Sequence, residues 1–479
     1  MNWSLLNFEF DTESETIPKQ TLVDLRLDAL FSENVLRIFS VPHSKKTIAA
    51  RQEVFRLLNN QIVWTWINEL YEKLKTLSLC VKNWESSNNE IERAFVFCNL
   101  IDAYIGLLVS INDCKYENGF FKLILENSEK QDFLVVSWKK NRCKYVDLLN
   151  IFSTVLYRYR INEGSIVIDY DEAENSYNDM VKNAEELFND IVFHEKNQKL
   201  SLSNSIADAM TIAYRKEIDD IKRIQEDYIV HVDFSILDIK SEIEFYFEVS
   251  KFVKDAEKKG MPICMPTISD EPRFVAEDAI DPALINNIEV VVSNSVDFIP
   301  ERSVSWLAGV NSGGKTTYLR TIGSNLVLFL SGAPVFCRNA SIFPFINVYT
   351  HFPSNETHKV GRFEEECTRV ETILSSIKSN YFVLLNETFS STDSQKGLAL
   401  GERVLSEIVE KSAFGLFVSH FDIQHSTRFN KLYTEIDYEN NGRPTFHIVS
   451  NENHNYEYVQ AILKKYKLDA KSLKERLYG

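Results

Sequence analysis

The distribution of proline constrains the fold of this chain more strongly than any other feature. Of eleven prolines, none lies between Pro42 and Pro262, and only four glycines fall in that interval. Average usage would place on the order of ten prolines there. Because proline breaks helix interiors and glycine weakens them, their scarcity predicts long helices. Apolar residues at helical spacing in "YRKEIDDIKRIQEDYIV" and "SEIEFYFEVSKFVKDAEKKG" indicate the same. Residues 43–262 are expected to form an elongated α-helical domain, with a short strand or turn at "GSIVIDYDEA" (164–173).

The composition changes at "GMPICMPTISDEPRF", where three prolines predict a linker over residues 263–275. Beyond it, strand-like runs such as "IEVVVSN", "VSWLAGV", "YFVLLN" and "FGLFVSH" alternate with helical ones. Such alternation is typical of an α/β domain with a largely parallel sheet, expected over residues 276–455. Residues 1–42 are expected to lead into the helical domain, and residues 456–479 to form a helical tail. The predicted fold class is α plus α/β.

Bulk properties narrow the classes of function. No apolar run approaches the length needed to span a bilayer, the start of the chain lacks the features of a secretory signal, and the seven cysteines are scattered. We therefore expect reduced thiols, a cytoplasmic location and no membrane partner. A net charge of −16 gives no overall attraction to nucleic acid. Two local basic stretches, 139–144 and 464–476, are either solvated helix faces or DNA contacts.

The stretch "GVNSGGKT" (309–316) fits the phosphate-loop pattern G-x-x-x-x-G-K-[ST] and lies between a predicted strand and a predicted helix. Its glycines allow backbone N–H groups to surround phosphate oxygens, the lysine can reach the outer phosphates, and the threonine can bind Mg²⁺. We therefore predict ATP and Mg²⁺ as cofactors. The predicted nucleotide-binding residues are Gly309, Asn311, Ser312, Gly313, Gly314, Lys315, Thr316 and Thr317.

Two further strands end in polar residues. "YFVLLNE" (381–387) ends in Asn386, where such sites hold a magnesium-binding aspartate, and in Glu387, a predicted catalytic base. The asparagine oxygen can still accept a hydrogen bond, so Thr316 and Asn386 are the predicted metal residues, with weakened Mg²⁺ binding. "FGLFVSHF" (414–421) ends in His420, predicted to sense the phosphate or to orient the attacking water. Hydrolysis is therefore expected to be slow.

Together these motifs resemble the ATPase domain of the MutS family over about residues 276–460. The matching stretches are "LAGVNSGGKTTYLRTIG", "LLNETFSSTDSQKGLALGERVL", "FVSHFDI" and "DPALI"; "KKTIAARQEVFRLL" is similar to the start of the family's lever domain. The resemblance implies an elongated helical lever or core domain followed by a P-loop (ABC-like) α/β ATPase domain. The chain is similar to short bacterial MutS-related ATPases that lack mismatch-recognition and connector domains.

The resemblance also implies a homodimer in which one subunit completes the nucleotide site of the other. In "HKVGRFEEECTRVETIL" (358–374) the residues at the place of the family's contacting serine are Gly361 and Arg362. We expect these two residues to make the contact across the dimer. The function that the resemblance implies is a dimeric, nucleotide-gated clamp on DNA. The alternative is a nucleotide-gated protein-interaction module with little or no hydrolysis and no DNA target. A chromosome-organising ATPase would carry a long coiled coil with a hinge between the phosphate loop and the strand that ends in Asn386. Only about 70 residues separate Lys315 from Asn386, so this class is disfavoured.

Overall fold

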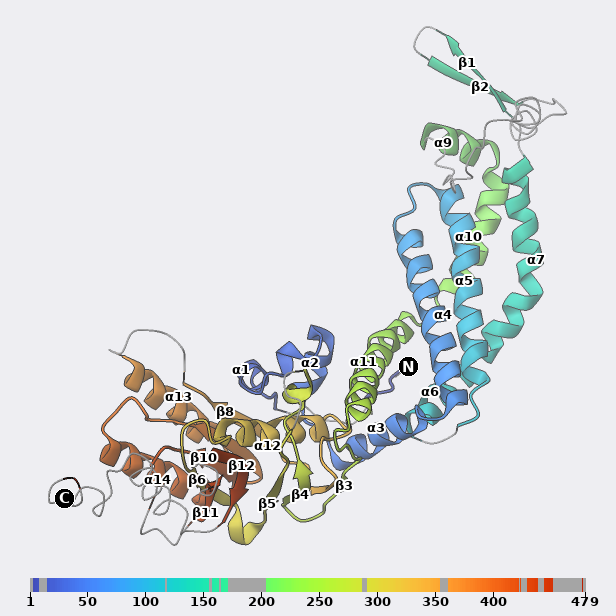
Figure 1. Cartoon of the computed structure of the whole chain (residues 1–479). Helices are drawn as coiled ribbons and strands as arrows, with labels where there is room; N and C mark the ends of the chain where they lie inside the picture. Colours follow the sequence, from blue (N-terminus) through green and yellow to red (C-terminus); the bar gives the residue numbers. More distant parts are fainter. Residues whose placement is uncertain are drawn as a thin grey trace. The chain divides into compact units, whose positions relative to one another are not determined.

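The structure is a computed structural model of the whole chain (Figure 1). It describes residues 3–7, 15–116, 119–154, 157–162, 165–170, 204–286, 291–353, 361–421, 423, 429–437, 443–450 and 476. These residues fall into two compact units. The helical unit contains residues 1–5 and 64–240, and the sheet unit contains residues 6–63 and 241–479.

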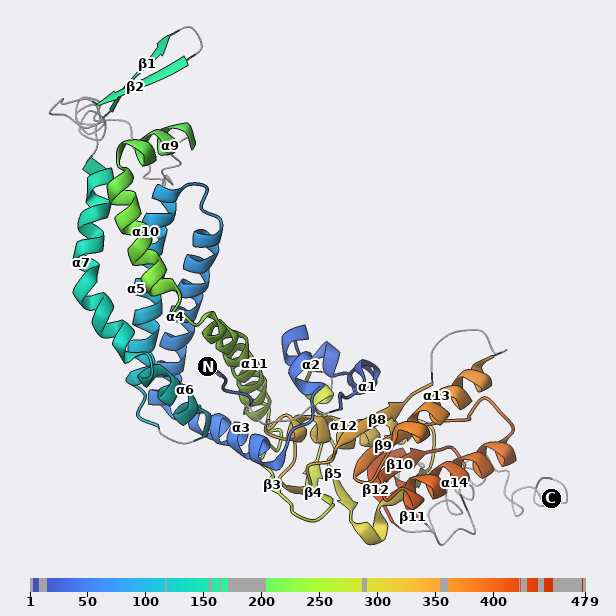
Figure 2. The same ribbon diagram turned by 180° about the vertical axis from the view of Figure 1, so that it is seen from behind.

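Long helices make up most of the helical unit (Figure 2). They are α4 (Gln61–Glu85), α5 (Glu90–Asn112), α6 (Gly119–Glu129), α7 (Asp132–Thr154), α9 (Asn204–Ala213) and α10 (Arg215–Ile229), with a 3-10 turn at Phe234–Leu237. α5 is the central helix and packs against α6, α7, α9 and α10. It begins at Asn89, whose side chain accepts a hydrogen bond from the Glu92 N–H and so satisfies one free donor of the first turn. The predicted helical period is confirmed in α10, where Ile218, Ile221 and Tyr228 are buried.

One helix corrects an expectation from the sequence. By length and composition, α5 is apolar enough to cross a membrane, so the statement that no apolar run approaches that length was wrong. Within the helical unit, 61% of its most apolar window is buried. Burial on several sides explains the composition, because a helix surrounded by neighbours is apolar all round. It is the only helix of this kind in the part of the chain that the structure describes.

A β-hairpin follows α7 in the chain. β1 (Tyr157–Asn162) and β2 (Ser165–Tyr170) are antiparallel, with Tyr157 opposite Tyr170 and Asn162 opposite Ser165. The strand predicted within residues 164–173 is confirmed for β2. The partner β1 was not predicted, because "YRYRIN" alternates tyrosine with arginine and gives no clear apolar face.

The main sheet of the sheet unit has the strand order β12-β11-β6-β10-β9-β8. Its strands are β6 (Val304–Ala308), β8 (Asn347–His351), β9 (Tyr381–Asn386), β10 (Phe414–Val418), β11 (Asn430–Asp437) and β12 (Arg443–Val449). All neighbours are parallel except β12, which runs antiparallel to β11 at the edge. β6, β9 and β10 are buried at every position, as expected for parallel strands covered on both faces. The predicted parallel α/β sheet is confirmed.

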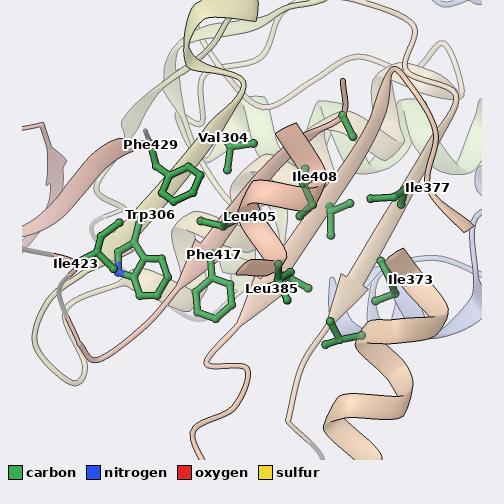
Figure 3. Packing of buried hydrophobic residues seen from close by; sticks show 14 of the residues in the cluster. Val304, Trp306, Ile373, Ile377, Leu385, Leu405, Ile408, Phe417, Ile423 and Phe429 are labelled. Carbon is green, nitrogen blue, oxygen red and sulfur yellow. The ribbon is translucent and has the colours of Figure 1, made fainter. Parts of the chain in front are cut away.

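Helices cover both faces of this sheet. α12 (Lys315–Leu330) packs against β8, β9 and β10, while α13 (Arg362–Ser376) and α14 (Ser394–Glu410) pack against β8, β10 and β6. Alternate residues of β9 point to opposite faces, so Leu385 joins the α13–α14 cluster and Leu384 approaches α12 at Gly323. In that cluster the rings of Trp306 and Phe417 stack with centroids 4.6 Å apart (Figure 3).

A second sheet of the sheet unit has the order β3-β7-β4-β5. It consists of β3 (Thr267–Ile268), β7 (Asn339–Ile342), β4 (Phe274–Ala279) and β5 (Asn294–Phe298), with 3-10 turns at Pro282–Asn286 and Pro300–Arg302. The stretch predicted as a linker therefore contains β3 and the first two residues of β4. The strand predicted at "IEVVVSN" lies partly outside the described residues, and β5 begins only at its last residue.

Four further helices belong to the sheet unit: α1 (Lys19–Asp24), α2 (Glu33–Phe39), α3 (Lys45–Leu57) and most of α11 (Asp238–Lys258), with a 3-10 turn at Leu27–Ala29. Residues 43–63 and 241–262, assigned to the helical domain from their period, thus pack with the sheets. Arg51 of α3 shows why: its buried guanidinium donates to the carbonyls of Leu6 and Ser331, the latter at the end of α12. The rings of Phe252 and Phe336 also meet. Periodicity identifies helices, but it does not reveal these long-range contacts.

Candidate functional site

The glycine loop, residues 309–314, connects β6 to α12. Gly309 and Gly314 have φ of 146° and 92°, values that residues with side chains rarely adopt. A Cβ on Gly309 would lie 2.1 Å from the Thr434 hydroxyl oxygen, so the loop also needs glycine for space. That hydroxyl accepts a hydrogen bond from the Val310 N–H and anchors the loop to β11. Free N–H groups at such a helix start favour anions, phosphate groups in particular.

Lys315 is the first residue of α12 and is buried, with its ammonium folded back over the glycine loop. It donates to the carbonyls of Gly309 and Val310, each at 2.9 Å. Burial lowers the pKa of Lys315, and the negative charge of Glu387 opposes that shift. A buried cation of this kind gains a strong partner when an anion occupies the loop.

The ends of β9 and β10 lie beside the glycine loop, because β10 pairs with both β6 and β9. The Thr316 hydroxyl donates to Asn386 Oδ1 over 3.2 Å. These are two oxygens of the kind that bind Mg²⁺. Glu387 follows directly, in a left-handed conformation with φ of 48°. Strained backbone of this kind often marks functional positions.

His420 connects the carboxylate to the lysine. Its Nε2 lies 2.9 Å from Glu387 Oε2, and its Nδ1 lies 3.5 Å from Lys315 Nζ. Because an ammonium can only donate, Nδ1 is the acceptor, and Nε2 carries the hydrogen that is donated to Glu387. The three side chains thus form one chain of polar contacts around the glycine loop.

A pocket of about 400 Å³ opens at this edge of the sheet. Among its lining residues are seven that the sequence analysis singled out for the site: Ser312, Gly313, Gly314, Lys315, Thr316, Thr317 and Glu387. Three other predicted residues contact this lining. The Gly309 carbonyl and His420 contact Lys315, and Asn386 contacts Thr316. Asn311 is an exposed residue of the loop itself. The structure therefore brings together the residues that three separate motifs predicted.

Other predicted residues lie elsewhere. Gly361 is the exposed N-cap of α13 and is not among the described residues that line the pocket. Arg362 is the first residue of that helix. The basic stretch 139–144 lies in α7, where Arg142 forms an ion pair with Asp102. The predicted tail, 456–479, lies outside the described residues apart from Arg476.

Part of the pocket wall was not predicted. Asn294 and Phe446 line it, and they are joined because Asn294 Nδ2 donates to the Phe446 carbonyl over 3.0 Å. Asp281, from the "DPALI" stretch, is a buried wall residue, and burial raises its pKa to about 6. Nothing in the local sequence marks Asn294 or Phe446, since both look like ordinary strand residues. Only the approach of β12 to β5 brings them to the loop.

Fold and site define a class: an α/β domain with a parallel sheet and a glycine loop at a helix start. The comparisons with known proteins narrow this class. The family MutS domain V matches residues 305–464, which include the glycine loop, Asn386, Glu387 and His420. The Endonuclease MutS2 of Bacillus velezensis is 24% identical over 244 residues, covering 50% of this chain and 30% of that protein. The Endonuclease MutS2 of Clostridium novyi is 25% identical over 239 residues, covering 48% and 29%.

Residues 305–464 are therefore MutS-related, and about half of the chain is similar to these relatives, as the motifs predicted. The alignments leave more than two thirds of each relative uncovered. This chain therefore matches less than a third of the length of either relative.

Proposed function

We propose that this protein binds ATP with Mg²⁺ at the pocket beside the glycine loop and hydrolyses it slowly. The observation that carries the proposal is the meeting of three motifs at the ends of neighbouring strands: the loop with Lys315, the Thr316–Asn386 contact, and the Glu387–His420 pair. The MutS domain V match over the same residues supports it. Sheets of this type bind ligands at the carboxyl ends of their strands.

The residues around the glycine loop fit a nucleoside triphosphate. The loop keeps its conformation only with glycine, because a Cβ on Gly309 or Gly313 would crowd Thr434, and the Lys315 ammonium supplies the countercharge for phosphate. Thr316 Oγ1 and Asn386 Oδ1 would hold Mg²⁺, which would neutralise charge on the phosphates. Asn386 brings no negative charge, so the site should require a high Mg²⁺ concentration. The remaining pocket wall, with Phe446 and Asn294, leaves space for the rest of the nucleotide.

Glu387 is the proposed catalytic base. It lines the pocket, and its hydrogen bond from His420 holds one carboxylate oxygen in place. The other oxygen can orient a water molecule and accept its proton. His420 would then act as a positioning residue, because it touches Glu387 and Lys315 at once.

Replacing Glu387 by glutamine tests this role. The variant should still bind ATP, because the loop is unchanged, but phosphate release should fall by roughly 100-fold or more, as expected for loss of a general base. Glu301→Gln is the matched control, since Glu301 is exposed in the turn that precedes β6, at the opposite edge of the sheet. Unchanged phosphate release in Glu387→Gln would show that Glu387 is not the base.

We further propose a cytoplasmic homodimer that acts as a nucleotide-gated clamp on DNA. In this proposal residues 64–240 of the helical unit serve as the lever domain and residues 276–455 as the ATPase domain. Gly361 and Arg362 contact the nucleotide of the second subunit. The position of Gly361 at the exposed start of α13 is compatible with such a contact, since a helix start offers free N–H groups. Filter binding to DNA at low and moderate salt tests the target. Absence of binding even at low salt would exclude the clamp on DNA.

The net charge of −16 favours one alternative, a nucleotide-gated module that grips a protein and not DNA. The two proposals differ in one measurement. A DNA clamp should change its rate of phosphate release when DNA is added, whereas the interaction module should not. Measuring the mass of the protein with and without ATP would test the dimer in both cases.

A further inference from the structure

Two cysteines lie side by side in the sheet unit, away from the proposed nucleotide pocket. The sulfur atoms of Cys264 and Cys337 are 3.4 Å apart, although 73 residues separate them in the chain. All seven cysteines are described and are free thiols, and this is the one contact between two of them among the described residues. A disulfide needs a separation of about 2.05 Å, so a movement of about 1.4 Å would close the bond.

The backbone holds the two thiols in place. Cys264 forms an isolated antiparallel bridge with Val335, in which each N–H donates to the other residue's carbonyl at 3.0 and 2.9 Å. Cys337 follows two residues later. The main chain thus holds the two cysteines close together, and their side-chain rotamers bring the sulfur atoms into contact.

The two thiols are not equivalent. The contact with Cys337 lowers the pKa of Cys264, while the same contact and burial raise the pKa of Cys337. Either sulfur can be the donor in this contact, and the direction of the two pKa shifts favours Cys337 as the donor. Because the thiolate is the reactive form of cysteine, Cys264 is the nucleophile of the pair.

Cys264 is also the accessible member. It is half-buried, whereas Cys337 is buried. A pocket of about 140 Å³ reaches Cys264 between α3 and α11, and its wall includes Arg56 and Lys254. The wall also includes the anion Glu257, and a small neutral oxidant can enter a pocket of this size.

We propose that Cys264 and Cys337 form a peroxide-sensitive dithiol that closes reversibly to a disulfide. The Cys264 thiolate attacks one oxygen of hydrogen peroxide, the O–O bond breaks, and the products are a sulfenic acid and hydroxide, which takes up a proton to become water. The Cys337 thiol then displaces the hydroxyl group of the sulfenic acid, which forms the S–S bond and releases a second water. Two thiols are oxidised by two electrons, and one peroxide is reduced.

The disulfide would cross-link two segments of the sheet unit that lie 73 residues apart in the sequence. Cys264 follows the end of α11, and Cys337 follows the end of α12. The closed segment contains β4, β5, β6, the glycine loop and α12. Because a disulfide across so long a loop restricts the unfolded chain, the thermal midpoint of the oxidised protein should rise by roughly 5 °C or more.

Peptide mass mapping after peroxide treatment tests the proposal. The full-length protein, treated with one equivalent of hydrogen peroxide and then alkylated, should yield a Cys264–Cys337 linked peptide that a dithiol reductant removes. In Cys337→Ser, Cys264 should instead stop at the sulfenic acid and react with dimedone. Cys98→Ser is the matched control, because Cys98 lies in the helical unit beside Asp102, where burial raises its pKa.

The outcomes separate clearly. A linked peptide in the wild type and in Cys98→Ser, together with dimedone labelling of Cys264 in Cys337→Ser, supports the proposal. Labelling spread evenly over all seven cysteines, or no linked peptide at one equivalent of peroxide, overturns it. A linked peptide without any rise in the thermal midpoint would overturn the inferred effect on the sheet unit.

Discussion

Replacing Asn386 by aspartate is the most direct test of the proposal that Asn386 lies next to the bound Mg²⁺. Asn386 is the last residue of β9, is 6% exposed and accepts a hydrogen bond from the Thr316 hydroxyl. Aspartate has nearly the same shape but adds a negative charge. Without metal, a carboxylate so deeply buried is poorly solvated, and we expect the variant to lose stability. With Mg²⁺ the added charge gains a partner, so stability should return.

The size of the expected effect follows from the general strength of one charge-assisted contact. Restoring one charge-assisted contact is worth about 1.5–3 kcal/mol where the metal contact is direct. Since about 1.4 kcal/mol corresponds to a factor of ten, the Mg²⁺ concentration at half-maximal phosphate release should fall by roughly 10- to 150-fold. A contact through a metal-bound water would give a smaller decrease.

The assay is a Mg²⁺ titration of phosphate release at saturating ATP, combined with thermal unfolding with and without Mg²⁺. Asn380→Asp is the matched control, because Asn380 directly precedes β9 and lies at the opposite end of the same strand. That end is about 20 Å away, given the rise per residue of a strand. If Asn386→Asp leaves the Mg²⁺ dependence unchanged, or Asn380→Asp shifts it equally, the asparagine does not lie near the metal.

Two further predictions concern stability. Gly323→Ala should destabilise the sheet unit by about 1–3 kcal/mol, because the new methyl would lie 2.4 Å from Leu25 in a packed core, whereas Gly106→Ala in α5 meets nothing within 4 Å and should stabilise by about 0.5–1 kcal/mol. Asp281→Asn should make the protein more stable at pH 7, by up to about 3 kcal/mol, since the pKa of Asp281 is raised to about 6 in the fold.

The sign for Asp281 follows from proton binding. Between pH 3.8 and 6 the folded chain holds a proton that the unfolded chain has released, so the unfolding free energy falls as pH rises through this range. The asparagine variant should lack that fall and should still accept the hydrogen bond from Ala283. Urea unfolding of each variant measures these effects. A destabilised Gly106→Ala, or equal pH profiles for Asp281→Asn and wild type, would contradict the packing and burial described above.

Much of the sheet unit could be predicted because its signals are local. The strands β6, β9 and β10 are short apolar runs followed by polar residues, and each begins or ends close to where the pattern indicated. The glycine loop combines a motif with a strand before it and a helix after it. In α10 the apolar spacing alone identified the buried face. These features depend on residues within a few positions of one another.

Other features could not be predicted because they depend on distant partners. β4 and β7 pair with each other across 60 or more residues, and neither has a clear alternation of its own. Phe446 reaches the pocket only because β12 lies at the sheet edge next to β5. The grouping of α3 with the sheets rests on contacts such as that between Arg51 and Ser331, 280 residues apart.

The sequence by itself determined where the glycine loop, Asn386, Glu387 and His420 lie along the chain, and that each lies at or just after the end of a buried strand. The tertiary structure decided that these strands are neighbours in the order β6-β10-β9, which joins the four features around one pocket. It also decided that Cys264 meets Cys337. The physical reason is the same in both cases. Local patterns fix the conformation of a segment, but hydrogen bonds and packing between distant segments fix which side chains touch.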